Sequence, residues 1–194
     1  MDLTGFFKAE FAAHHDVARR TEAALANAFA GLVRACAASI RGGGKLMFFG
    51  NGGSAGDAQH LATELTVRYR QNRAAIAALA LTTDTSALTA AGNDLGFDQV
   101  FARQIEALGR PGDITIAIST SGKSPNVVAA LRQAKAMKLT TAAFGGQGGG
   151  DLVGLADHLL LVPSDVVARI QEMHITLGQM LCGALEIELG LVQR

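Results

Sequence analysis

From residue 45 onward, short apolar runs alternate with stretches of helical periodicity. Five of these runs are predicted to be strands, over residues 45–49, 76–81, 114–118, 140–144 and 159–162. Helices are predicted between and after them, near residues 54–68, 85–92, 98–108, 125–137, 151–155 and 166–189. A strand that is apolar on both faces has to be covered on both faces, as in a parallel sheet between two layers of helices. The sequence therefore predicts a single α/β domain with a five-stranded parallel sheet flanked by helices.

Two helical patterns precede the first strand and predict an N-terminal helical extension over residues 1–41. The second pattern runs from Leu25 to Ile40 at spacings of three and four and ends at the glycines 42–44. The first pattern has Thr4 as its expected N-cap and consists of Leu3, Phe6, Phe7 and Phe11. A small α/β unit has limited room for both apolar stripes, so residues 1–41 are expected either to contact another subunit or to pack within the chain. We predict a single domain over residues 1–194.

The charge balance and the cysteine count exclude several classes of protein. The 17 Lys and Arg residues are offset by 17 Asp and Glu residues, so the net charge does not favour binding to nucleic acid or to an anionic membrane surface. Cys36 and Cys182 cannot make a disulfide framework, which fits a reducing compartment. The first residues lack the basic region of a signal peptide, and no run of 18 apolar residues occurs. We expect a cytoplasmic protein without nucleic-acid or membrane partners.

Two loops that follow predicted strands are rich in residues that bind anions. The first is Gly50-Asn51-Gly52-Gly53-Ser54, in which Ser54 and Asp57 are expected to form a capping box on the next helix. The second loop contains Ser119, Thr120, Ser121 and Ser124. Ser124 is the expected N-cap of the following helix, with Pro125 at its first position. Backbone N–H groups and hydroxyls at a helix N-terminus suit a phosphate, although such loops also occur for purely structural reasons.

Two further groups of polar residues lie on predicted helices. His60 and Glu64 are spaced i,i+4, so they share one helix face and could hold a divalent ion such as zinc; a solvated face is the alternative. Arg68 is expected to continue this face and to meet an anionic substrate. On the last helix, Gln171 and His174 belong to a polar cluster in an apolar stretch, which needs partners of a structural or functional kind.

Taken together, these motifs resemble the phosphoheptose isomerases, which have the sugar isomerase (SIS) fold. The resemblance covers nearly the whole chain and is carried by Asn51–Ser54 with Asp57, His60 and Glu64, by Gly92-Asn93-Asp94, by Ser119–Ser124 and by Arg169–His174. It implies a homotetramer with active sites at subunit contacts and one zinc ion per subunit. The implied reaction converts sedoheptulose 7-phosphate to D-glycero-D-manno-heptose 7-phosphate, a precursor of bacterial lipopolysaccharide heptose.

The resemblance also implies roles for individual residues. The phosphate would be held by Ser119, Thr120, Ser121 and Ser124. The sugar would be lined by Asn51, Gly52, Gly53, Asn93 and Asp94. Ser54, Arg68 and Gln171 are further candidates for binding the substrate. The zinc ligands would be His60, Glu64, Gln171 and residue 179, and Glu64 would also be the catalytic carboxylate. The family has a histidine at the last of these positions, which serves as the second acid–base group, whereas this chain has Gln179.

This departure predicts weaker zinc binding and slower turnover. An aldose–ketose interconversion through an enediolate needs a carboxylate base, a group that moves the hydroxyl proton and a positive centre for the oxyanion. A glutamine can be a weak oxygen ligand but cannot exchange a proton near neutral pH. A bound water or His174 could replace it, and a structural, hydrogen-bonding histidine is the alternative for His174. The alternative function is a non-catalytic SIS tetramer that binds a phosphosugar or a protein such as the replication initiator.

Overall fold

The five apolar runs form one parallel sheet in the computed structural model, which describes residues 1–193. The strand order is β2–β1–β3–β4–β5. The strands are β1 (Leu46–Gly50), β2 (Ala78–Ala80), β3 (Ile114–Ser119), β4 (Thr140–Gly145) and β5 (His158–Leu161). Strands β1 and β3 are buried along their whole length, as the absence of polar alternation predicts. The predicted fold class, a five-stranded parallel α/β sheet flanked by helices, is confirmed.

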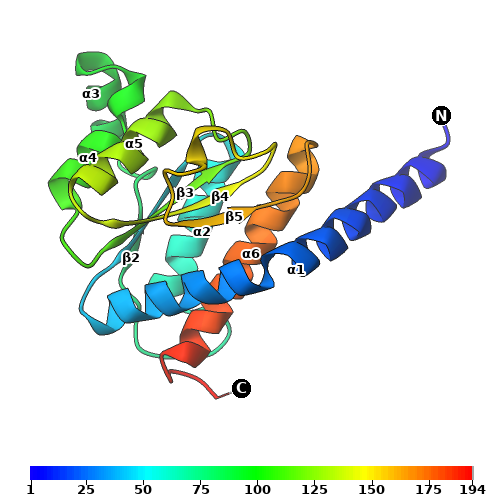
Figure 1. Cartoon of the computed structure of the whole chain (residues 1–194), viewed down its shortest axis with the longest axis horizontal. Helices are drawn as coiled ribbons and strands as arrows, with labels where there is room; N and C mark the ends of the chain where they lie inside the picture. The colour runs from blue at the N-terminus through cyan, green and yellow to red at the C-terminus, as the bar shows by residue number, and fades with distance from the viewer. Residues whose placement is uncertain (194) are drawn as a thin grey trace.

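Helices cover both faces of the sheet, as Figure 1 shows. They are α1 (Leu3–Arg41), α2 (Gly53–Thr66), α3 (Thr85–Asp94), α4 (Ala102–Leu108), α5 (Pro125–Ala136) and α6 (Val167–Glu188). Alternate residues of β1 point to opposite sides: Phe48 packs with α1, α2 and α6, whereas Phe49 packs with α3, α4 and α5. Two expected helices differ from the prediction. Residues 151–155 form only a 3₁₀ turn, Gly150–Leu152, and a second 3₁₀ turn, Phe97–Gln99, takes up the start of the helix expected over 98–108.

The two predicted N-terminal helices are one continuous helix, so that prediction is wrong. No glycine or proline interrupts residues 12–24, and a helix that meets no breaker continues. The N-cap is Asp2 rather than Thr4, because the Asp2 carboxylate accepts a 2.9 Å hydrogen bond from the Gly5 N–H. Figure 1 shows the N-terminal end of α1 extending beyond the other helices. The residues Leu3, Phe6, Phe7 and Phe11 on this end are all exposed.

Among residues 1–193, α1 is also the helix that is long and apolar enough to cross a membrane. Its mean hydropathy reaches 1.5 over 18 residues. This is weak evidence, because the core helix of a protein without a membrane span passes the same test. Here Leu32 and Cys36 of α1 are fully buried against the sheet and α6.

His174 of α6 lies inside the core and has no exposed surface. Its ring Nε2 donates a 3.1 Å hydrogen bond to the carbonyl of Gly145, and the ring packs 6.1 Å from that of Phe144. The other nitrogen, Nδ1, is buried without a hydrogen-bond partner. Burial lowers the pKa of His174 to about 4, against the small opposing effect of the Gly145 hydrogen bond. The imidazole is therefore neutral in the folded chain at neutral pH.

This neutral histidine makes stability depend on pH between about 6.5 and 4. In that window the unfolded chain binds a proton at His174 that the folded chain does not, so stability falls as the pH falls and the effect levels off below about 4. The loss is about 3 kcal/mol. Urea unfolding of the wild type and of His174→Gln between pH 7 and 4 measures it, because glutamine keeps a donor for Gly145 but does not titrate. Parallel pH profiles for the two proteins would contradict the buried neutral state.

Candidate functional site

The two glycine- and serine-rich loops lie side by side at the carboxyl ends of β1 and β3. These strands are neighbours, with Gly50 opposite Ile118. From β1 the chain continues to β2 on one side and then crosses back to β3 on the other, so this is the switch point at which open α/β sheets bind ligands. The approach is close: a Cβ on Gly50 would lie 2.6 Å from the Ile118 carbonyl oxygen. The sheet thus brings together the two loops that the sequence singled out.

The first loop starts α2 earlier than the sequence predicts. Gly52, not Ser54, is the N-cap, with a φ of +56° that favours glycine. The expected capping box is therefore wrong, because Ser54 already lies inside the first turn and is buried. Asp57 instead lies close to His60. Burial raises the pKa of the Asp57 carboxyl, and the charge of His60 opposes this rise.

The second loop is shaped by its own serines. The Ser119 hydroxyl accepts a 3.1 Å hydrogen bond from the N–H of Gly122, and the Ser121 hydroxyl accepts a 3.2 Å bond from that of Lys123. Ser124 is the N-cap and Pro125 the first residue of α5, as predicted, but the Ser124 side chain makes no capping bond. Ser121 and Ser124 are partly exposed residues at a helix N-terminus, where backbone dipoles favour an anion.

A pair of asparagines joins the two loops, and sequence reasoning missed one of them. The side-chain amide of Asn51 donates to Asn126 Oδ1, and the amide of Asn126 donates to Asn51 Oδ1, each over 2.8 Å. Asn126 lies in the first turn of α5 and is 1% exposed. A buried amide has to be hydrogen-bonded, so this pair fixes the distance between the loops. The signal in the sequence was only a polar residue directly after Pro125.

A second cluster of polar groups lies further along α2, where α6 crosses it. His60 Nε2 is 3.0 Å from Glu64 Oε1 and also 3.0 Å from Gln179 Nε2. The helices come this close because residue 178 is a glycine, whose Cβ would lie 2.5 Å from Leu61 Cδ1. His60 is half exposed and Glu64 is more shielded. Three of the four residues predicted to bind zinc therefore meet at one point.

The contacts of His60 are compatible with a cation in this cluster. One imidazole nitrogen cannot donate to the Glu64 carboxylate and also accept from the Gln179 amide. A cation between the three groups would remove this conflict, with the amide turned to present its oxygen. His60 and Glu64 are both donors that zinc accepts, and a glutamine oxygen is a weaker one. Among residues 1–193, no three His, Cys, Asp or Glu side chains form a metal-binding group. The residues fit a zinc ion with two strong ligands.

The remaining candidates lie apart from this cluster. Gln171 lies against the first turn of α2, because a Cβ on Gly53 would be 3.3 Å from its Nε2. The prediction that Arg68 continues the face of His60 and Glu64 is wrong. Helix α2 ends at Thr66, and Arg68 is an exposed residue of the following loop. His174 lies in the core, as described above.

Asn93 and Asp94 end α3, in the opposite layer of helices from α2 and α6. They are exposed, and the Asn93 amide donates a 2.7 Å hydrogen bond to Asp94 Oδ1. A single chain therefore does not bring them next to His60.

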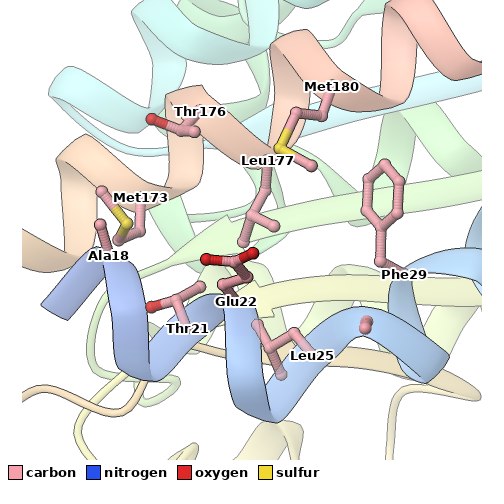
Figure 2. A pocket seen from close by; sticks show the side chains of 10 residues that line it. Ala18, Thr21, Glu22, Leu25, Phe29, Met173, Thr176, Leu177 and Met180 are labelled. Carbon is pink, nitrogen blue, oxygen red and sulfur yellow. The ribbon is translucent and has the colours of Figure 1, made fainter.

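A hollow of about 410 Å³ lies between α1 and α6 (Figure 2). Its walls are mostly apolar and include Leu25, Phe29, Met173, Leu177 and Met180. A sugar phosphate needs many polar partners, so this lining does not suit one.

Comparisons with known proteins identify the family of the chain. The model of the SIS domain family matches residues 11–146. The phosphoheptose isomerase of Paramagnetospirillum magneticum is 58% identical over 186 residues, which cover 96% of this chain and 97% of that protein. Two solved structures of phosphoheptose isomerases are also similar. The one from Neisseria gonorrhoeae has 41% identity and a TM-score of 0.90, covering 95% of this chain and 99% of its own. The one from Francisella tularensis has 35% identity and a TM-score of 0.93, covering 96% and 100%. The chain therefore belongs to the phosphoheptose isomerases of the SIS-domain family.

Proposed function

We propose that the chain is an isomerase that interconverts sedoheptulose 7-phosphate and D-glycero-D-manno-heptose 7-phosphate in the cytoplasm, supplying heptose for lipopolysaccharide. The observation that carries the proposal is that His60 and Glu64, on the helix that starts at the glycine-rich loop after β1, meet Gln179 of α6. Gly53 and His60 are seven residues apart on α2, which is about 10 Å along a helix axis. That separation suits a ligand with a phosphate at one end and its reacting carbons at the other.

In this proposal the loop after β3 binds the phosphate. Ser119, Thr120, Ser121 and Ser124 offer hydroxyls, and the first turn of α5 offers N–H groups. Asn51, Gly52, Gly53, Ser54 and Gln171 line the path from this loop toward His60. Arg68, in the loop after α2, remains a candidate for the anionic substrate.

Glu64 is the proposed base that moves the proton between the two carbons. Its contact with His60 orients the carboxylate, and its partial burial removes competing water. Zinc held by His60 and Glu64, with Gln179 as a weaker ligand, would supply positive charge for the developing oxyanion. Gln171 lies at the first turn of α2 and would have to change position to join these ligands. Gln179 can hold a hydroxyl by a hydrogen bond but cannot take its proton. Because His174 is buried with a pKa of about 4, a water molecule is the better candidate for that transfer.

The proposed assembly is a homotetramer with active sites at subunit contacts. Two observations support it. The apolar end of α1 and the apolar hollow between α1 and α6 are surface that a second subunit would cover (Figure 2). In addition, Asn93 and Asp94 lie at the end of α3, in the opposite layer of helices from the His60 cluster of their own subunit. A neighbouring subunit would therefore have to supply them.

An isomerase assay with sedoheptulose 7-phosphate and added zinc tests the proposed function. We expect measurable aldose formation by the wild type, and a loss of about 10²- to 10⁴-fold in kcat for Glu64→Gln, because the amide cannot accept the proton. Binding of the substrate should persist in the variant and can be measured by calorimetry. A wild-type chain that binds the sugar phosphate without converting it would support the non-catalytic alternative.

Replacing Asn126 tests whether the asparagine pair holds the two loops together for phosphate binding. Asn126→Ala leaves the Asn51 amide without its partner and frees the loops, so we expect KM to rise by about tenfold. Arg132→Ala changes an exposed residue of the same helix and serves as the matched control. Equal KM values in the wild type and in Asn126→Ala would exclude this role.

Restoring a histidine at position 179 should raise both zinc affinity and turnover. Imidazole is a stronger zinc ligand than an amide oxygen and can carry a proton, so kcat of Gln179→His is expected to increase by about 10²-fold or more. A chelator competition measures zinc, and Gln133→His on α5 controls for an added histidine far from the site. If the wild type already turns over at a typical enzyme rate and kcat of Gln179→His is no higher, Gln179 does not stand in place of a lost catalytic group.

A further inference from the structure

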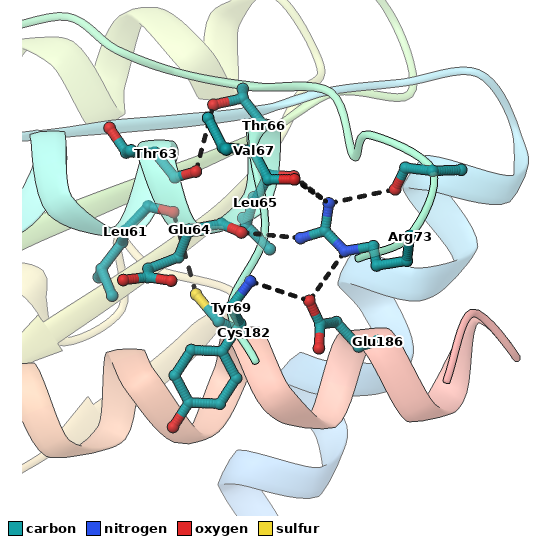
Figure 3. Close-up of polar contacts among 11 residues, drawn as sticks. Leu61, Thr63, Glu64, Leu65, Thr66, Val67, Tyr69, Arg73, Cys182 and Glu186 are labelled. Atoms are coloured by element: carbon teal, nitrogen blue, oxygen red, sulfur yellow. Dashed lines mark hydrogen bonds and ion pairs between the residues drawn. The ribbon is translucent and has the colours of Figure 1, made fainter. Parts of the chain in front are cut away.

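A buried ion pair lies against the C-terminal end of α2, the helix that carries Glu64 (Figure 3). Arg73, in the connection from α2 to β2, contacts Glu186 of α6 over 2.8 Å from Nε to Oε1. The two side chains are 1% and 2% exposed. Glu186 Oε1 also accepts a 3.1 Å hydrogen bond from the backbone N–H of Tyr69. The pair thus joins α6 to the loop that leaves α2.

The Arg73 guanidinium caps the end of α2. It donates to the carbonyls of Glu64 over 2.7 Å and Leu65 over 2.8 Å, and also to those of Val67 and Ala74. The last carbonyls of a helix have no N–H partner within the helix, and a positive charge there is favourable. Arg73 therefore holds the backbone of Glu64 itself and of the next residue.

One face of α6 lies against both the C-terminal end of α2 and the Glu64 side chain. Gln179, Cys182 and Glu186 are spaced by three and four residues and so share one face of α6. Gln179 contacts His60, the Cys182 thiol points to the Leu61 carbonyl, and Glu186 holds Arg73. Burial raises the pKa of Cys182 to about 12, and the charges of Glu64 and Glu186 add to this rise, which agrees with a Glu64 carboxylate directed toward α6.

Stability alone does not account for a buried pair of this kind. Apolar residues of similar volume often stabilise a core as well as a buried ion pair does. The position of the ion pair next to Glu64 offers a better reason for its presence. Glu64 lies only two residues before the end of α2, and helix ends fray when their carbonyls are not held. A carboxylate on a fraying turn would leave His60 for part of the time.

We infer that Arg73 and Glu186 are positioning residues that hold the Glu64 carboxylate against His60. The inference rests on the proposed function in that Glu64 is there the base. Arg73 acts through the backbone of Glu64, and Glu186 acts through Arg73. Loosening the pair should therefore lower kcat more than it changes KM, because the proposed phosphate site lies beside the first turn of α2, far from its C-terminal end.

The test uses Arg73→Lys, which keeps the charge but cannot reach several carbonyls at once, and Glu186→Gln, which keeps the shape but removes the charge. Arg103→Lys is the matched control, because Arg103 makes an exposed 2.7 Å ion pair with Glu106 on α4. We expect kcat of Arg73→Lys to fall on the order of 10²-fold, as for a misplaced catalytic group, with KM within about twofold. The kcat of Glu186→Gln should fall less than that of Arg73→Lys, and the kcat of Arg103→Lys should match that of the wild type.

Crystal structures of the variants and thermal unfolding complete the test. Glu64 displaced from His60, together with a lower kcat in protein that is folded at the assay temperature, supports the inference. An unchanged kcat, or a Glu64 that still contacts His60, overturns it. If Arg73→Lys does not fold, Glu186→Gln decides by the same criteria. If the wild type has no isomerase activity, the proposed function fails, and the position of Glu64 in the variant structures alone decides the inference.

Discussion

The contact between Gly178 of α6 and Leu61 of α2 is the constraint on which the candidate site depends. A Cβ at position 178 would lie 2.5 Å from Leu61 Cδ1, so a larger residue would displace the buried Leu61 side chain or push the two helices apart. The close approach lets Gln179 reach His60 and lets Glu186, two turns further on, reach Arg73. One steric condition thus sets both the chemistry at His60 and the support beneath Glu64.

The strand order provides the other half of the site. Because β1 and β3 are neighbours and the chain leaves them toward opposite sides, their carboxyl ends open into the same crevice. The asparagine pair then fixes the width of the crevice, and α2 leads from it to His60. In the proposed function, the phosphate site lies beside the start of α2 and the proton-transfer site near its C-terminal end, and the helix between them sets the length of ligand that fits both.

Local patterns were enough to predict the strands, most helices and the two loops. Continuous apolar runs such as that ending at Phe49 and an N-terminal proline such as Pro125 act within a few residues, so they can be read from the sequence. The errors have physical causes as well. Two N-terminal helices were predicted, but residues 12–24 contain no helix breaker and α1 is continuous there. Ser54 was predicted to be the N-cap of α2, but the positive φ of Gly52 lets the helix begin earlier. Asn126 and Arg73 were missed because their partners lie 75 and 113 residues away.

The place of Glu64 near the end of α2 has an electrostatic consequence that links stability to reactivity. The C-terminal end of a helix carries partial negative charge, which disfavours a carboxylate there by some tenths of a kcal/mol to about 1 kcal/mol. Arg73 binds the same carbonyls that carry this charge and so offsets it. Glu186 in turn neutralises the buried guanidinium, which would be costly without a partner. A carboxylate beside His60 is thus compatible with a well-ordered helix end, because the compensating guanidinium of Arg73 is buried in the core and does not occupy the site around His60.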